Sequence, residues 1–525
     1  MSNRNPVSSL WVNCCSPLAA LVFLCGASLA PGAGVTVITH GFNGNVTDWV
    51  IPMGDKMAQY RTFPGTNSAS YQISITRAGS VYSFSQSFLD GVSPLASDSG
   101  EIVIALDWSS VSGFPGPSTA LIATNAALAL LSTSLIPDLA GRPLAELPLH
   151  LVGHSRGASV MAELARILGA QGIWVDHLTT LDPYPLGLDA DPSMANYANV
   201  LFADNYWQNM GAPSGQSFAG AYNRHLTNLD HGYASSHSDV HLWYHGTIDL
   251  NTPISVDQAL ITSSERTAWW TTTEAAGTNA AFLYSLVGGG DRLSNLEPAG
   301  PGNGRIRDGF NQRWDLGAGV AANPATNRTQ LPVNSGAWPN LLRLNLTGTN
   351  HVAIGDPIPL AFYHQYASST AAVATIRFSL DADLNPYNGN ELPVAQTTLA
   401  GTGTNNVLYS ALSLVLDPAS ALPGTYALFA RISDATHARY LYALQRLVLA
   451  PSREPPVLAA AGVQAGQFRL RVFGWPGQTV VLQASTNLAQ WVALTTNTLA
   501  GTSLEYTDPD SVNQPQRYYR ALLLQ

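Results

Sequence analysis

The sequence predicts an α/β domain with a mostly parallel sheet and helices on both faces, followed by two all-β, sandwich-like domains. Three observations predict it. Between about residues 35 and 290, short apolar runs rich in β-branched residues alternate with helix-like stretches. From about residue 338 no helical period persists, and short alternating runs are separated by turns. Stretches rich in Gly and Pro, 288–304 and 451–456, stand between these regions.

Residues 1–33 have the pattern of a signal peptide. Arg4 supplies a weakly positive start, and the apolar run "LAALVFLCGASLA" at 18–30 is followed by small residues. The three cysteines of the chain, Cys14, Cys15 and Cys25, all lie in this segment. Cleavage would leave a mature chain without cysteine, exported to the cell surface or the medium; an uncleaved anchor is the alternative.

The next elements follow in order along the predicted catalytic domain, residues 34–290. Strands are expected at 35–39, 101–108, 149–153 and 177–182, and helices at 118–136 and 157–168. A Gly/Pro-rich linker is expected at 291–337, a β-sandwich domain at 338–450, and a small β module at 457–525.

Composition limits the classes of partner. The 525 residues are 46% hydrophobic and only 11% charged, and the net charge is −10 with no cluster of Lys and Arg. Nucleic acid is therefore not an expected partner.

The stretch "LHLVGHSRGASVMAELARIL", 149–168, places Gly-His-Ser-Arg-Gly between an apolar strand and an amphipathic helix. This Gly-x-Ser-x-Gly arrangement is a nucleophile elbow, in which a tight turn raises the serine hydroxyl above the sheet. Ser155 is the candidate nucleophile. The alternative is a Gly-rich turn with an ordinary serine.

A serine nucleophile needs a base, and the base needs an orienting acid. Asp182 ends the strand in "LTTLDPYP" and is the candidate acid, whereas a turn-capping role before Pro183 is the alternative. Asp176, Asp189 and Asp191 are less well placed.

The base is expected in "HLTNLDHGYASSHSDVHLWYHGTI", 225–248. His237 follows a Ser-rich turn and is the candidate. His225, His231, His241 and His245 remain open, and a zinc site on the His241–His245 face is disfavoured because no His-Glu-x-x-His arrangement is present.

The expected oxyanion donors are two backbone N–H groups. "VTVITHGFNGN", 35–45, ends a strand in His-Gly-Phe, so the Phe42 N–H is one donor and the Arg156 N–H after the nucleophile is the other. His40 is expected to hold this loop rather than to transfer protons.

Taken together, five ordered motifs within about residues 35–250 resemble the pancreatic-lipase-like branch of the α/β-hydrolases. They are "THGFNGNVTDW", "VIALDW", "LVGHSRGA", "LTTLDPYP" and "SHSDVHLWY". The resemblance implies an α/β-hydrolase fold and lipase- or esterase-like activity, and it favours His237 because Trp243 and Tyr244 follow it at the family's spacing. The segment 457–525 is similar to a recurrent C-terminal module of secreted bacterial proteins.

These observations predict a secreted serine hydrolase that cleaves carboxylic esters of a small or lipid substrate without a cofactor. One alternative keeps the triad but cleaves an amide or a polymeric ester. The other is an inactive surface or adhesion protein, in which the β modules contact a cell surface or polymer. "DADLNPYNGNE" places Asp381, Asp383, Asn385 and Glu391 where a Ca²⁺ loop or a strand-connecting turn would fit.

Overall fold

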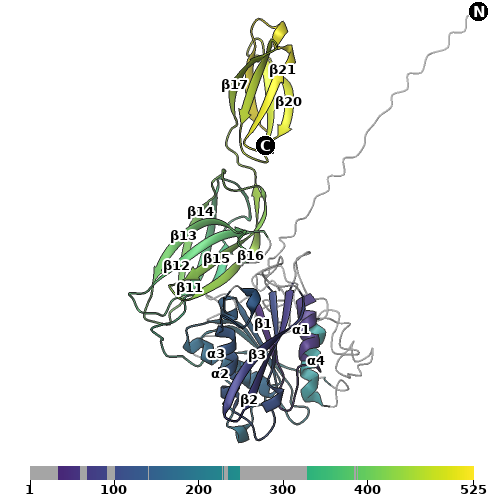
Figure 1. Ribbon diagram of the computed structural model, residues 1–525, viewed down its shortest axis with the longest axis vertical. Coiled ribbons are helices and arrows are strands. Elements are labelled where there is room, and N and C mark those ends of the chain that lie inside the picture. The colour runs from purple at the N-terminus through teal and green to yellow at the C-terminus, as the bar shows by residue number, and fades with distance from the viewer. Residues whose placement is uncertain are drawn as a thin grey trace, which may run out of the picture.

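The computed structural model describes residues 34–59, 68–91, 101–139, 141–227, 229, 235–248, 328–382, 386 and 388–524. The predicted signal peptide, most of the predicted linker and Asp383 and Asn385 of the predicted Ca²⁺ loop lie outside these residues. Figure 1 shows three units in succession, with the small C-terminal unit at the far end from the N-terminal sheet.

The N-terminal unit is built on one eight-stranded sheet. Its neighbouring strands are parallel, except that β2 and β3 form an antiparallel hairpin at one edge. In spatial order the strands are β3 (Val81–Gly91), β2 (Ser68–Ala78), β4 (Glu101–Asp107), β1 (Val35–Thr39), β5 (Leu149–His154), β6 (Val175–Leu181), β7 (Val200–Trp207) and β8 (Tyr222–His225). The central strands β1, β5 and β6 are buried along their whole length, as their continuous apolar runs require.

Four α-helices belong to the described part of this unit: α1 (Val50–Gln59), α2 (Thr119–Leu131), α3 (Arg156–Ala170) and α4 (Ser236–Ile248). They cover opposite faces of the sheet. Ile122 of α2 and Val160 of α3 pack in the same core as Val37. Met53 of α1 and Val240 of α4 pack in a second core with Ile38, which points to the other face of β1. The alternation of β1 side chains thus separates the two cores.

The second unit is a sandwich of two sheets around an apolar core that includes Phe362 and Phe378. One sheet has the order β10 (His351–Ala353), β16 (Ala438–Ala450), β15 (Gly424–Ser433), β12 (Val373–Asp381) and β13 (Leu392–Ala400). The other has the order β14 (Leu408–Val415), β11 (Pro357–Gln365) and β9 (Asn340–Leu346).

The C-terminal unit consists of two three-stranded sheets around a small core that includes Leu470 and Leu482. One sheet contains β17 (Val457–Gln464), β18 (Gln467–Phe473) and β21 (Ser503–Asp508). The other contains β20 (Val492–Thr498), β19 (Thr479–Ser485) and β22 (Tyr518–Leu523).

The sandwich packs tightly against the N-terminal unit. Phe429 and Tyr442 of the sandwich belong to the same apolar core as the N-terminal sheet. The Arg439 side chain is buried between the units, where it donates to the carbonyl oxygens of Ala145 and Trp174, at 2.7 and 3.1 Å, and to the Asp176 carboxylate at 3.2 Å. These contacts hold the sandwich against the end of the sheet at which β5 and β6 begin.

The predicted fold class is wrong for the chain as a whole. The described residues contain twenty-two strands in five sheets and only four α-helices, so the molecule is mostly β rather than a helix-rich α/β-hydrolase fold. Sequence analysis gave too much weight to the alternation in the first half and missed the β2–β3 hairpin. In the described residues, no helix combines the length and apolar character needed to span a membrane.

Candidate functional site

Ser155 lies in the sharp turn between β5 and α3. Its φ of 56° and ψ of −125° are an unusual backbone conformation for a residue with a side chain. Two bonds hold the turn: the Ser155 N–H donates to the Leu181 carbonyl at 2.8 Å, and the Tyr184 N–H donates to the Ser155 carbonyl at 3.1 Å. The nucleophile predicted from sequence is therefore fixed at the carboxyl ends of β5 and β6.

The glycine after the nucleophile is required by close packing. A Cβ atom at Gly157 would lie 2.2 Å from the carbonyl oxygen of His40, which is far inside contact distance. Gly41 is as constrained, because a Cβ there would lie 2.7 Å from the Ser155 Cβ and 3.1 Å from its Oγ. The His-Gly-Phe loop after β1 thus lies directly against the serine side chain.

Asp182 and His237 form a buried pair. The His237 Nδ1 lies 2.5 Å from the Asp182 Oδ2, and the two side chains are 10% and 0% exposed. A carboxylate only accepts hydrogen bonds, so His237 donates from Nδ1 and its Nε2 is left to act as a base. The structure brings His237, rather than His241, to the predicted acid.

The Asp182 carboxylate has further donors that the sequence did not reveal. Its Oδ1 accepts from the backbone N–H groups of Gln208 at 2.8 Å and Gly215 at 3.0 Å, and its Oδ2 accepts from the Gln208 side-chain amide at 2.8 Å. Gln208 is fully buried. These donors fix the orientation of the acid, but no motif marks Gln208, which follows β7 in a segment without a clear pattern.

His154 connects the elbow to the base. Its Nε2 lies 2.8 Å from the His237 carbonyl oxygen, and since a carbonyl only accepts, the His154 Nε2–H donates. Its ring lies against that of His237, with centroids 4.6 Å apart. Burial, followed by the charge of His237, holds the pKa of His154 well below its usual range. His154 therefore stays neutral beside the base.

His241 lies one turn along α4 and is packed rather than exposed to a substrate. Its ring stacks on Trp49 with centroids 4.3 Å apart and contacts the edge of His154 at 4.6 Å. Burial, and then the charges of His154, His237 and His245, lower its pKa well below the usual value. This environment is that of a neutral core histidine.

Two backbone N–H groups near the serine are candidate donors to a reacting oxygen. Among the described residues, no acceptor takes the N–H of Phe42 or of Arg156. Arg156 is the first residue of α3, whose N-terminal N–H groups have no partner within the helix. Gly41, the residue before Phe42, lies directly against Ser155, so the loop that carries the Phe42 N–H adjoins the serine. The arrangement suits stabilisation of a developing negative charge.

His40 supports the oxyanion loop, as its sequence context predicts. It is fully buried, its Nδ1–H donates to the Gly41 carbonyl at 2.9 Å, and its ring stacks on Trp108 with centroids 5.1 Å apart. These contacts hold the loop in the position that touches Ser155.

The Arg156 side chain points away from the reacting side and anchors the elbow. Its guanidinium is fully buried and pairs with the Asp191 carboxylate at 2.7 Å and with that of Asp189 at 3.0 Å. It also donates to the Pro117 carbonyl at 2.7 Å. Asp189 and Asp191 were the weaker candidates for the acid of the triad. In the structure they hold the elbow through the Arg156 side chain.

The other candidate histidines are not at the site. His225 stacks on Trp207 and contacts the Asn209 side chain at 2.9 Å. His245 is buried on α4, and His231 lies outside the described residues. In the described part of the chain, no group of three or more His, Cys, Asp or Glu side chains could hold a metal ion.

Comparisons with known proteins do not place the chain in a family. No family model matches it, and no curated protein matches it. Solved structures that share local similarity include a biofilm-associated protein BSP domain (14% identity, 36% of this chain, 27% of that chain, TM-score 0.12), red sea bream transglutaminase (9%, 40%, 34%, 0.14) and the human OSCAR ligand-binding domain (16%, 35%, 93%, 0.15). The chain thus spans only about a quarter and a third of the first two proteins.

The family suggested by the sequence is corrected accordingly. The assignment to the pancreatic-lipase-like branch, with the α/β-hydrolase, hydrolase and lipase labels that depend on it, has no support from a family model or a curated relative. The mostly β content of the chain argues against it as well. Short motifs describe local turns, and they did not suffice to fix a family. Any functional conclusion must therefore rest on the geometry of the site.

Proposed function

We propose that this chain cleaves carboxylic esters through an acyl intermediate on Ser155. The observation that carries the proposal is the buried Asp182–His237 pair at 2.5 Å, which belongs to the same cluster as the strained Ser155 turn. The base is oriented by the acid, and His154, next to the serine, bonds to the main chain of the base. A structural histidine does not require this alignment.

In the proposed reaction, Ser155 Oγ attacks the acyl carbon while His237 Nε2 takes the hydroxyl proton. The Phe42 and Arg156 N–H groups bind the oxyanion, and the α3 N-terminus adds a favourable dipole. The imidazolium then gives its proton to the leaving alcohol. Water, deprotonated by the same imidazole, then attacks the acyl carbon. The bond to Ser155 Oγ breaks, the imidazolium returns its proton to that oxygen, and the carboxylic acid leaves. The Asp182 side chain holds the imidazole in place and stabilises its charged form.

The activity is proposed to operate outside the cell, because residues 1–33 have the pattern of an export signal. The same triad would also serve an amide, because the catalytic histidine can protonate a leaving amine as well as an alcohol. Cleavage of an amide or of a polymeric ester is an outcome of the test below.

The test compares the full chain with Ser155→Ala. The wild type should react with a fluorophosphonate probe and hydrolyse p-nitrophenyl acetate and butyrate. Ser155→Ala should lose labelling and reduce kcat by about 10⁴- to 10⁶-fold, because the nucleophile is removed and the small side chain is kept. A Ser110→Ala variant serves as the matched control. If the folded wild type is neither labelled nor active, the chain is a binding protein. If it is labelled but cleaves only anilides, the ester proposal is wrong.

A further inference from the structure

A pocket lies at the opposite end of the N-terminal sheet from Ser155. It has a volume of about 450 Å³, within the range of small-molecule sites. It lies at the interface between the N-terminal unit and the sandwich, which we call the seam. Trp174 and Asn199, which precede β6 and β7, form one wall. Ser155 and Asp182 follow β5 and β6 at their other ends, so about 20 Å of strand separates the two sites.

The sandwich wall presents two tyrosines. Tyr363 of β11 and Tyr409 of β14 are directly opposite each other, with ring centroids 5.2 Å apart in an edge-to-face arrangement. Tyr409 is 59% exposed and Tyr363 is partly exposed. In the described part of the chain, neither hydroxyl has a hydrogen-bond partner. An exposed pair of this kind offers a ligand both apolar ring faces and two hydroxyl groups.

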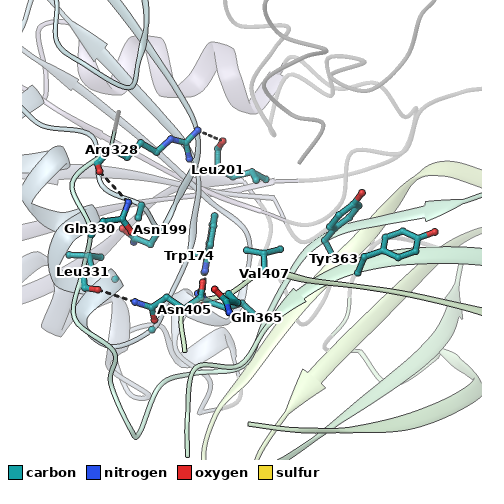
Figure 2. A pocket seen from close by; sticks show the side chains of 15 residues that line it. Trp174, Asn199, Leu201, Arg328, Gln330, Leu331, Tyr363, Gln365, Asn405 and Val407 are labelled. Carbon is teal, nitrogen blue, oxygen red and sulfur yellow. Dashed lines mark hydrogen bonds between the residues drawn. The ribbon is translucent and has the colours of Figure 1, made fainter. Parts of the chain in front are cut away.

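The polar groups of the pocket are held in fixed positions. The Asn405 side chain donates to the Leu331 carbonyl at 2.9 Å, and the Asn405 backbone carbonyl accepts from the Gln365 side-chain amide at 2.9 Å (Figure 2). Gln365 accepts in turn from the Trp174 indole at 2.8 Å. This chain of bonds crosses the seam and pins the loop between β13 and β14 over the pocket. A site of this kind is preorganised for binding.

The charge of the lining selects a neutral ligand. Arg328 is the single charged residue among the described residues that line the pocket. Its guanidinium is buried and donates to the backbone carbonyls of Val200 and Leu201, so it binds the protein itself. The exposed polar groups are the amides of Gln330, Asn405 and Asn406. Amides both donate and accept, as hydroxyl groups do.

We infer that this seam pocket binds a neutral carbohydrate. A sugar ring has apolar C–H faces that pack on aromatic rings, and hydroxyls at its edge that pair with amides and phenols. Both features occur together here, and the described residues of the lining include no carboxylate and no lysine that would select an ion. The inference does not depend on the proposed esterase activity, because none of the lining residues belongs to the Ser155 site.

The test is native gel electrophoresis of the full chain with soluble xylan, glucomannan or mixed-linkage β-glucan in the gel. At least one polysaccharide should retard the wild type. Tyr409→Ala should bind about tenfold more weakly, as expected for loss of an aromatic contact. Leu408→Ala, the exposed neighbour on β14 that does not line the pocket, should bind as the wild type does.

Gln330→Ala offers a second variant at an exposed position on the opposite wall, and it should also weaken retardation. If the esterase proposal holds, fluorophosphonate labelling of Ser155 shows whether a variant is folded. If that proposal fails, a thermal melt shows whether the variant is folded. The inference is overturned if none of the three polysaccharides retards the wild type. It is equally overturned if Tyr409→Ala and Gln330→Ala are folded and retarded like Leu408→Ala.

Discussion

At the scale of single residues, the choice between His237 and His241 is the sharpest result. His237 pairs with Asp182, whereas His241 stacks on Trp49, so the two histidines have different environments one helical turn apart. The spacing of later aromatics already favoured His237. The contacts of His241 could not be foreseen, because Trp49 is distant in sequence.

We predict that His237→Ala reduces kcat/KM on p-nitrophenyl acetate nearly as much as Ser155→Ala does. The double variant should be little worse than either single one, because triad members act as a unit. His241→Ala should cost much less activity, since it removes ring packing on Trp49 and His154 rather than the pair with Asp182. Loss of activity in His241→Ala, with His237→Ala still active, would contradict the assignment.

His154 is expected to act as a positioning residue for the base. His154→Phe keeps a ring but removes the donor to the His237 carbonyl, so kcat should fall roughly two- to tenfold with KM nearly unchanged. His154→Gln retains an N–H donor and should recover part of the loss. The pH profile of kcat/KM is the decisive measurement, because a merely structural role would leave the apparent pKa of the base where it is in the wild type.

At the scale of elements, the apolar runs predicted β1, β4, β5 and β6 close to their observed bounds. Strand β7 was missed because Asp204 and Asn205 interrupt its apolar run. Both are buried, and both are satisfied by side chains of β6: His177 and Thr179 bond to Asp204, and Thr180 bonds to Asn205. Such cross-strand pairing cannot be read from one strand alone. Because β7 was not predicted, Gln208, which follows this strand and orients Asp182, was not predicted either.

The contact between α4 and the elbow predicts a loss of stability in acid. His154 and His241 have pKa values well below 6.5 in the folded chain, so the unfolded chain binds more protons below that pH. Stability is therefore fully present above about pH 6.5 and falls as the pH drops, by about 1.4 kcal/mol per pH unit for each histidine.

Urea denaturation at pH 7.5, 6.0 and 5.0 measures this slope. His241→Phe removes one titrating group and keeps a ring against Trp49, so its slope between pH 6.0 and 5.0 should be shallower than that of the wild type. Equal slopes in the two proteins would show that His241 is not held neutral by the fold.

At the scale of the whole molecule, the seam between the sheet and the sandwich shows contacts that a linker between separate domains would not lead one to expect. A Gly/Pro-rich linker is typical of a boundary between domains that fold independently. Yet residues 328–337 of the predicted linker include Arg328, bound to Val200, and Asn334, bound to Ala170. The apolar core is shared with the sandwich as well. Linker composition does not reveal such contacts.

We predict that Arg439→Met destabilises the chain by about 3–5 kcal/mol, because it leaves the buried Asp176 carboxylate without its cation. The Arg453→Met control removes an exposed ion pair with Asp356 and should change stability by less than about 1 kcal/mol. The midpoint of urea denaturation, followed by tryptophan fluorescence, compares them. Similar midpoints for Arg439→Met and the wild type would mean that the seam does not stabilise the sheet.

The same seam has a consequence for how the chain is made. Arg439 follows Asp176 by 263 residues. The sheet therefore leaves the ribosome long before Arg439, which pairs with Asp176 at one end of the sheet. At about 5–20 residues per second, that interval lasts on the order of tens of seconds. During it, Asp176 has no arginine and the apolar patch that receives Phe429 and Tyr442 faces water. A ribosome-bound chain ending before residue 428 should therefore recruit chaperones, and release of the full chain should end that need.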